Sequence, residues 1–376
     1  MKELGIYVHI PFCVHKCLYC DFYSMPADDS VKSAYAESVI TQIGAESEKY
    51  RDNYHVVSIF LGGGTPSTMD TVLIRRIIRA IRDGFLVDED CEISIECNPA
   101  TVDAGILREY RATGINRISL GLQSANDEEL RAIGRIHDFK DFMKTYEAVM
   151  LAGFNNVNVD IMSSLPMQTA ASYRKTLRTV CALRPSHISA YSLILEENTP
   201  LYDMYNRGQI KLCDEDEDRR LYYLTGEELS RAGYERYEIS NYARDNKRCR
   251  HNVNYWRRTD YLGIGVGASS LIKNTRYDIE KDIRHYIENP LGCYVNSNEL
   301  SISEQMSEFM FLGLRMTKGV REDDFRRNFG RHMYNVYGDV IDRYSASGHL
   351  VFENGNLRLT PKGVDVSNYI FSDFIL

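Results

Sequence analysis

Hydrophobic and polar positions in the first half of the chain follow two alternating periods. Short runs rich in β-branched residues are each followed by a polar or glycine-rich turn and then by an amphipathic stretch of helical period. The runs predict six strands, over residues 5–10, 56–61, 92–96, 116–122, 156–161 and 187–193. The amphipathic stretches predict helices over residues 31–51, 70–85, 103–113, 138–151 and 170–183.

This regular alternation predicts the fold class. Strands that alternate with helices favour a parallel sheet with right-handed crossovers. Six such units are too few for a complete eightfold barrel. We therefore expect an α/β protein whose residues 1–200 form a partial (β/α)6 barrel of the TIM type.

The pattern changes after about residue 200. Residues 201–300 contain a charged helix near 214–232 and aromatic, glycine-rich segments, which predict an extension or cover of the barrel. Residues 301–376 contain helical stretches at 304–316, 321–328 and 331–347, followed by a hairpin over 350–359 with an Asn354-Gly355 turn. Helices followed by a hairpin predict a small winged-helix-like α+β domain at the C-terminus.

Composition and charge exclude several classes of protein. The chain has 376 residues, 44% of them hydrophobic and 26% charged, and it contains no apolar run long enough to cross a bilayer. Its first residues lead directly into a strand and do not resemble a secretory signal, so we expect a cytoplasmic location. The net charge of -8 disfavours nucleic acid as a partner. Residues 301–376 carry nine Lys/Arg against ten Asp/Glu, which argues against a DNA-binding role for the predicted winged-helix-like domain.

Unusual polar or glycine residues follow each of the first five predicted strands. Because parallel strands of a barrel end on one face, these residues are expected to meet there. They are the cysteines of 13–20, the Gly-Gly-Gly-Thr-Pro run of 62–66, Glu96, Gln123 with Arg135 soon after, and Asp160.

Three cysteines in the first of these loops predict a metal centre. Cys13, Cys17 and Cys20 are close enough in sequence for their sulfurs to converge on one cluster. Structural zinc is the alternative, but it usually needs four ligands, and the other six of the nine cysteines are scattered singly. In a [4Fe-4S] cluster, three thiolates leave one iron open to an external ligand, so the spacing favours a site for chemistry.

The other strand-end residues suit a small polar ligand. Glycines 62–64 allow close backbone approach to an amino acid moiety, although a plain tight turn is the alternative. Glu96 and Asp160 can accept hydrogen bonds from ribose hydroxyls or an ammonium group, and Arg135 can pair with a carboxylate. Each of them alone could equally form a surface ion pair.

The Cys-x3-Cys-x2-Cys spacing resembles that of the radical SAM superfamily. Residues 7–13, 62–67, 121–124, 165–166 and 261–265, together with Asp160, resemble the oxygen-independent coproporphyrinogen III oxidase-like family. The resemblance implies that Cys13, Cys17 and Cys20 bind a [4Fe-4S] cluster. It also implies contacts with S-adenosyl-L-methionine from Tyr7, Gly64, Thr65, Glu96, Gln123, Arg135 and Asp160.

Two features separate the branches of this family. The oxidase has a fourth cysteine where this chain has Phe22, and it carries a longer arm before the first strand. The Cys20-Asp21-Phe22 form and the segment 250–256 instead resemble the haem chaperone branch, HemW. This implies a protein that binds haem and passes it to an acceptor, for example a respiratory, membrane-associated protein, with a homodimer as a candidate assembly. The alternative is the oxidase, which decarboxylates propionate side chains by radical chemistry.

The segment 250–256 also contains candidate haem contacts. Imidazole is a common haem ligand, so His251 is a candidate, and Tyr255 and Trp256 can cover a porphyrin. The alternative is that the aromatic residues pack the barrel's cover and His251 caps a helix or bonds a carbonyl. Given the resemblance, we expect haem contact near His251, with Cys249 as a second candidate.

Overall fold

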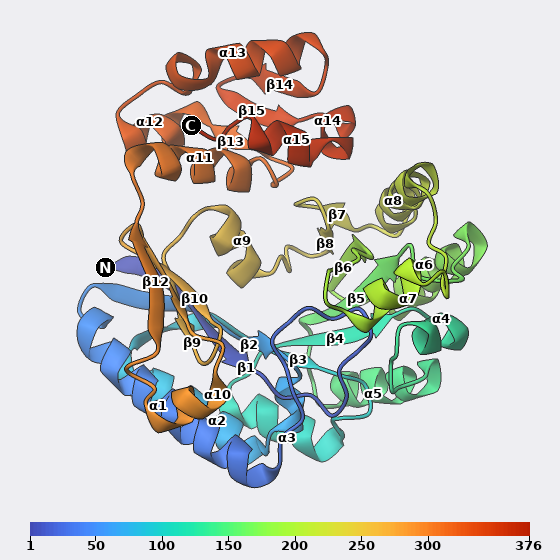
Figure 1. Ribbon diagram of the computed structural model, residues 1–376, viewed down its shortest axis with the longest axis vertical. Coiled ribbons are helices and arrows are strands. Elements are labelled where there is room, and N and C mark those ends of the chain that lie inside the picture. Colours follow the sequence, from blue (N-terminus) through green and yellow to red (C-terminus); the bar gives the residue numbers. More distant parts are fainter.

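A computed structural model describes residues 1–376. Six parallel strands form the centre of the molecule, as the sequence predicts (Figure 1). They are β1 Lys2–Ile10, β2 Tyr54–Gly63, β3 Leu86–Cys97, β4 Arg117–Gln123, β5 Val157–Ser163 and β6 His187–Ser192. β3 starts six residues before the predicted strand, directly after the preceding helix.

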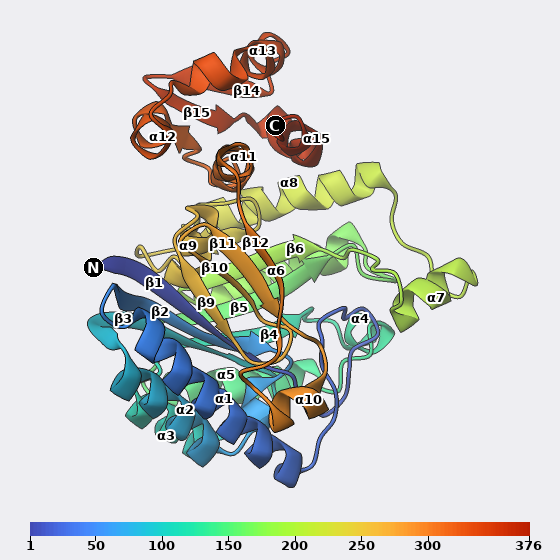
Figure 2. The same ribbon diagram turned by 60° about the vertical axis from the view of Figure 1, so that its left-hand side comes forward.

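Helices cover the outer face of this sheet (Figure 2). Five were predicted, and the short α4 was not. They are α1 Asp29–Tyr50, α2 Thr71–Gly84, α3 Ala104–Thr113, α4 Asp127–Ala132, α5 Phe139–Leu151 and α6 Ala170–Leu183. Asp28, Asp70, Asp103 and Asp138 cap α1, α2, α3 and α5 by accepting hydrogen bonds from first-turn amides. Apolar faces of strands and helices meet in a core of 55 buried residues.

Residues 201–300 extend the sheet at both edges, which gives it twelve strands in the order β12-β11-β10-β9-β1-β2-β3-β4-β5-β6-β8-β7. β9 pairs in parallel with β1, whereas β8 pairs antiparallel with β6. The added strands are β7 Glu235–Arg236, β8 Asn241–Ala243, β9 Tyr261–Ile264, β10 Ser269–Ile272, β11 Thr275–Ile279 and β12 Tyr294–Glu299. The helices of this region are α7 Pro200–Asn206, α8 Glu215–Arg231, α9 Arg250–Trp256 and α10 Ile283–Glu288. The twelve strands form an open sheet, so the barrel is partial.

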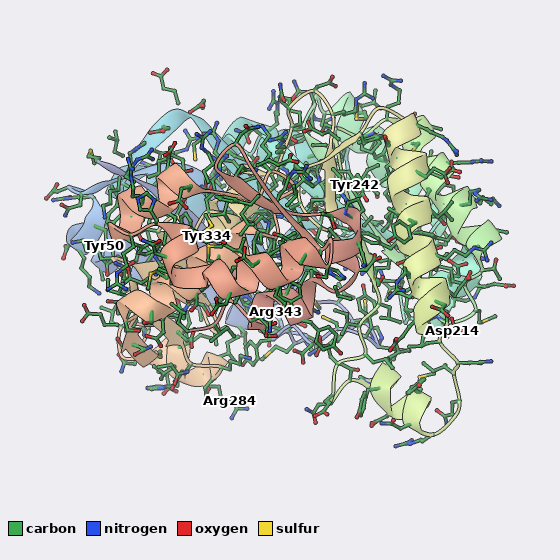
Figure 3. The ribbon with its side chains drawn as sticks, turned by 90° about the horizontal axis from the view of Figure 1, so that it is seen from above. Tyr50, Asp214, Tyr242, Arg284, Tyr334 and Arg343 are labelled. Atoms are coloured by element: carbon green, nitrogen blue, oxygen red, sulfur yellow. The ribbon has the colours of Figure 1, made fainter.

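The C-terminal residues form a second body above the sheet (Figures 1 and 2). It has its own core of 13 buried residues and a sheet of order β13-β15-β14. Seen from above, α13 crosses the molecule with Tyr334 and Arg343 along it, while α8 starts near Asp214 at one side (Figure 3). The elements of this C-terminal body are α11 Ile302–Gly313, β13 Val320–Arg321, α12 Glu322–Phe329, α13 Met333–Ala346, β14 Leu350–Glu353, β15 Asn356–Leu359, α14 Pro361–Asp365 and α15 Ser367–Ser372.

The two bodies touch through the end of α9 and the turn after α11. The guanidinium of Arg315 lies 4.5 Å from the centre of the Trp256 ring, and the Thr317 amide donates to the Tyr237 carbonyl at 3.0 Å. The single tryptophan therefore packs between the bodies. None of the helices combines the length and the apolar character needed to cross a bilayer.

Candidate functional site

The three clustered cysteines lie in the loop that follows β1. Cys13, Cys17 and Cys20 are free thiols, partly buried, and all three line one cavity of about 570 Å³. This cavity lies at the C-terminal ends of the parallel strands, where such folds place their sites. Burial raises the pKa of the Cys20 thiol above its usual value, so a positively charged metal centre is what would favour its thiolate.

Most of the other predicted residues share this cavity. Six of the seven predicted S-adenosylmethionine contacts line it: Gly64, Thr65, Glu96, Gln123, Arg135 and Asp160. The seventh, Tyr7, is not in the lining, and its hydroxyl is hydrogen-bonded to His9 Nδ1 at 3.0 Å. Tyr7 points into the barrel below the cavity, where its ring lies 6.3 Å from that of Phe60.

A hydrogen-bonded chain of side chains joins two of the cysteines. Cys13 Sγ lies 3.4 Å from Thr65 Oγ1, which accepts from Asn98 Nδ2 at 3.1 Å. Asn98 Oδ1 in turn accepts from Arg135 Nη2 at 2.6 Å, and Arg135 Nη1 lies 3.5 Å from Cys17 Sγ. The sequence analysis did not identify Asn98 as a site residue. Asn98 lies just after β3, two residues beyond Glu96, and a place at the end of a strand is the signal that identified the other site residues.

Two carboxyl groups lie at the inner wall of the cavity. Burial and the neighbouring Asp160 carboxylate raise the pKa of Glu96 from its usual value of 4.5 to about 7. Burial also raises the pKa of Asp160, against the hydrogen bonds it accepts from Asn158 Nδ2 at 2.7 Å and Ser119 Oγ at 3.1 Å. Two buried acids of this kind suit a ligand that brings a positive charge or several hydroxyl donors.

The glycine run is needed for packing as well as for access. The Gly64 amide donates to the Ile10 carbonyl at 2.8 Å, and the Thr65 amide donates to the Phe12 carbonyl at 2.7 Å. A Cβ at Gly64 would lie 2.8 Å from that same Phe12 oxygen, so the cysteine loop and the glycine loop touch through their backbones. Protein carbonyls therefore occupy the amides of Gly64 and Thr65, and these two amides are not free for a ligand.

The N-terminal end of the barrel is closed by α9. The Glu92 carboxylate, inside the barrel, accepts from the amides of Arg250 at 3.0 Å and His251 at 3.2 Å. Cys249 Sγ lies 3.5 Å from the same carboxylate. A carboxylate at this position satisfies the free amides and the positive end of the helix. The segment 249–256 thus plugs the barrel.

His251 is enclosed by this plug. Its Nδ1 lies 3.0 Å from Ser58 Oγ, its ring stacks 5.2 Å from Phe60, and the residue is 2% exposed. Burial, with the charge of Arg117, lowers the pKa of His251 to about 3, so the ring is neutral. The expected haem contact at His251 does not fit this arrangement, because a porphyrin cannot reach a ring packed inside the barrel. Cys249, 0% exposed, is equally out of reach.

Exposed side chains of both kinds line the cavity: polar ones at His15, Lys16, Asp21 and Glu196, and two large apolar ones. Phe22 is 68% exposed, and Ile194 is 69% exposed. Both side chains line the same cavity as the three cysteines. An exposed aromatic and an exposed aliphatic side chain beside a polar cavity are typical of a surface that binds a partly apolar ligand.

Family models match both bodies of the chain. Residues 7–180 match the Radical SAM superfamily, and residues 300–366 match the HemN C-terminal domain. The match to the first begins at Tyr7 and includes every cavity residue named above up to Asp160.

Full-length relatives are also found. The heme chaperone HemW of Lactococcus lactis is 33% identical over 377 residues, which cover 100% of this chain and 98% of the relative. The heme chaperone HemW of Escherichia coli is 36% identical, over 93% of this chain and 92% of the relative. Among solved structures, coproporphyrinogen III oxidase (HemN) from Escherichia coli matches with a TM-score of 0.86 and 22% identity, over 100% of this chain and 90% of that chain. At that identity the structural match establishes the fold alone.

Proposed function

This chain belongs to the HemW family of radical SAM proteins, and on that premise we propose that it is a haem chaperone, which binds haem and transfers it to an acceptor protein. The proposal includes a cytoplasmic location and a homodimer, and an acceptor of the respiratory, membrane-associated kind. It divides the chain into a barrel of residues 1–200, an extension of residues 201–300 and a C-terminal domain of residues 301–376.

The cavity residues fit the two cofactors of the superfamily. Cys13, Cys17 and Cys20 offer three thiols on one loop, which is the donor set for a [4Fe-4S] cluster with one open iron. With the cluster bound, its open iron would supply a binding position for S-adenosylmethionine. The proposed contacts to this molecule are Gly64, Thr65, Glu96, Gln123, Arg135 and Asp160, which line the cavity, and Tyr7, which lies outside the lining and whose hydroxyl bonds to His9.

One observation supports haem handling over porphyrinogen oxidation. The oxidase's fourth cysteine is replaced by Phe22, which is exposed and lines the same cavity as Ile194. An exposed aromatic ring offers a porphyrin a face to stack on, while a thiol at that place would not. We place haem at this cavity, in preference to the enclosed His251.

Haem titration of the full-length protein, reconstituted anaerobically with iron and sulfide, tests the proposal. We expect stoichiometric haem binding with a Soret band, and no protoporphyrinogen from coproporphyrinogen III and S-adenosylmethionine. Phe22→Ser should weaken haem binding about tenfold, or roughly 1.4 kcal/mol. Tyr369→Ser is the matched control, because Tyr369 is 76% exposed but lies on the C-terminal domain.

The cluster is tested in the same preparation. Cys17→Ser should abolish the cluster absorbance and lower the iron content, because two thiolates do not hold the cube. Cys181 lies on α6, away from the cavity, so Cys181→Ser should keep the cluster absorbance and the iron content. Protein that fails to bind haem, or that forms protoporphyrinogen together with 5'-deoxyadenosine, would contradict the proposed function.

A further inference from the structure

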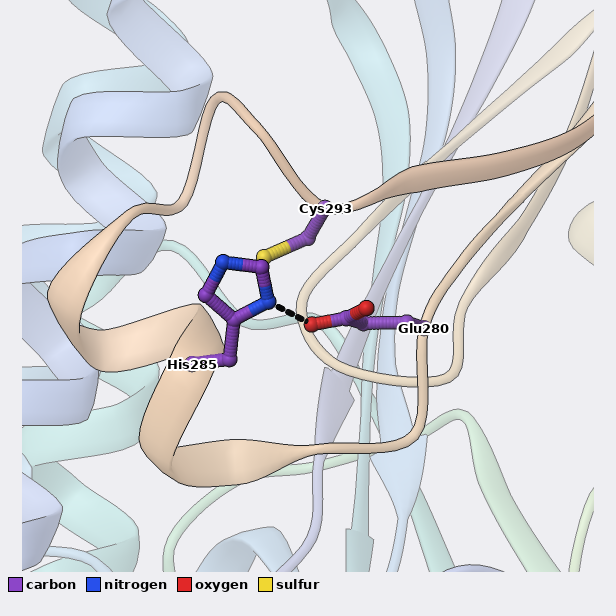
Figure 4. A group of neighbouring side chains, drawn as sticks. All are labelled: Glu280, His285 and Cys293. Atoms are coloured by element: carbon purple, nitrogen blue, oxygen red, sulfur yellow. Dashed lines mark hydrogen bonds and ion pairs between the residues drawn. The ribbon is translucent and has the colours of Figure 1, made fainter.

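Glu280, His285 and Cys293 meet at one corner of the sheet extension, which we call the α10 corner (Figure 4). We propose that the α10 corner is a divalent metal site of the zinc class. None of the three residues lines the cavity of the cysteine loop, so this site is separate from the cluster.

The three residues come from three successive segments. Glu280 follows β11, His285 lies on α10, and Cys293 immediately precedes β12. One ligand atom from each lies within 4.8 Å of the other two. Around a tetrahedral zinc ion with bonds of about 2.0 to 2.3 Å, ligand atoms are roughly 3.3 to 3.8 Å apart. Side-chain movements on the order of 1 Å therefore suffice to bring the three atoms onto one ion.

The donor set suits zinc. It offers one sulfur, one imidazole nitrogen and one carboxylate oxygen, and these three donors together match zinc better than magnesium or calcium, which prefer oxygen alone. Glu280 Oε1 already contacts His285 Nδ1. Cys293 Sγ lies 3.1 Å from the Asn289 carbonyl, to which the thiol can donate. Metal binding would release the thiol proton and leave a thiolate on the ion.

The scaffold around the α10 corner is well anchored. The Glu280 amide donates to the Cys293 carbonyl at 2.9 Å, which joins two of the three segments. Tyr286 on α10 donates through its hydroxyl to Gln42 Oε1 of α1 at 2.6 Å, and Ser38 Oγ donates to the Ile287 carbonyl at 3.0 Å. These contacts fix α10 against α1, so the three ligands start from defined places.

Exposure differs across the site in a way that leaves room for a fourth ligand. Cys293 is 0% exposed, whereas the side chains of Glu280 and His285 are 28% and 45% exposed. The thiol lies inside and the other two donors face outward, so water can complete the tetrahedron from the solvent side. A metal here would tie α10 to the ends of β11 and β12.

Cobalt binding to the full chain tests the site directly, because a thiolate on Co²⁺ gives a charge-transfer band. The chain carries Cys13→Ser, Cys17→Ser and Cys20→Ser for this measurement, so that the cluster thiols do not compete. We expect one Co²⁺ with a sulfur charge-transfer band and tetrahedral visible bands, both removed by Zn²⁺. Adding Cys293→Ser should remove the sulfur band, and adding His285→Ala should weaken binding by about 100-fold.

Two control variants test whether the cobalt signal comes from the α10 corner. His332 forms an exposed pair with Glu322 at 2.8 Å like that of His285 with Glu280, and His332→Ala should leave cobalt binding unchanged. Cys181→Ser should leave the sulfur band unchanged.

In the cluster-loaded protein, Zn²⁺ should raise the melting temperature, and His285→Ala should remove that rise while haem binding persists. Absence of a sulfur band, or a band that survives Cys293→Ser, would overturn the proposal. Loss of haem binding with an intact cobalt signal would instead count against the proposed function alone.

Discussion

The two ends of the barrel are built from the same six strands but end in opposite ways. At the C-terminal end, Glu96 and Asp160 lie at the wall of an open cavity. At the N-terminal end, Glu92 and Arg117 lie in the same interior, but α9 fills the space above them. Burial disfavours the charged guanidinium of Arg117, but the acidic groups around it, Glu92 among them, together favour it more, so the pKa of Arg117 lies above its usual value.

This difference shows how to judge a buried polar residue. At the closed end, the Glu92 carboxylate has protein partners in the amides of α9, so its role is structural. At the open end, Arg135 Nε has no hydrogen-bond partner in the protein, and the Glu96 carboxyl accepts from one amide, that of Gly63 at 3.1 Å. At the closed end His251 Nε2 and Arg117 Nε also lack partners, but neither residue lines the cavity of the cysteine loop. Unused polar capacity beside a cavity is where a ligand can bind.

The largest effect is expected from breaking the closed end. Glu92→Ala leaves two amides of α9 without their acceptor and removes a negative charge that favours the buried Arg117 guanidinium, which should lower the free energy of unfolding by about 3 to 5 kcal/mol. Chemical denaturation measures it. Glu92→Gln keeps an acceptor oxygen, so it should lower the free energy of unfolding less. Glu89→Ala, at an exposed position of the same strand, should leave the free energy of unfolding almost unchanged. A loss in Glu92→Ala no larger than in Glu89→Ala would mean that α9 does not depend on this carboxylate.

At the open end, the burial of Glu96 should make the stability of the protein depend on pH. The folded chain holds the Glu96 proton more tightly than the unfolded chain, because its pKa is raised to about 7. The stability of the ligand-free protein should therefore fall as pH rises from the usual value of 4.5 through 7, and remain low above it.

Glu96→Gln cannot ionise, so it should be more stable than the unsubstituted protein above pH 7, by about 3 kcal/mol. The difference should vanish at low pH, where both side chains are neutral. Denaturation curves across this range measure it, with Glu89→Gln as the exposed control on β3. A pH-independent difference would contradict the burial of an ionisable Glu96.

The smallest effect is expected from replacing Arg135, whose planar guanidinium is part of the open end. Arg135→Lys keeps the charge but cannot bond Asn98, the Gly121 carbonyl and Cys17 at once. We expect S-adenosylmethionine binding to the reconstituted protein to weaken about tenfold, or roughly 1.4 kcal/mol. Isothermal titration measures it, and the exposed Arg131→Lys on α4 should bind normally. Equal affinity in both variants would remove Arg135 from the proposed binding set.

Local patterns identified most of the open end. The six strands and five of their helices were predicted from hydrophobic period alone, and the polar residues after each strand were expected to meet because parallel strands end on one face. Cys13, Glu96 and Asp160 do line one cavity. Tyr7 does not, because the register of β1 places it one layer further inside, among Phe60 and His251. Period alone cannot tell which of two inward layers a residue occupies.

The sequence by itself determined the βα alternation, the three-cysteine loop and the family, since each depends on residues that are neighbours in the chain. Only the tertiary structure decided where residues 201–300 go. It paired β9 with β1 across some 250 positions, turned 249–256 into the plug of the barrel and brought Glu280, His285 and Cys293 together. Those outcomes depend on which distant surfaces bury one another and which buried charges find partners, and neither is encoded in any local period.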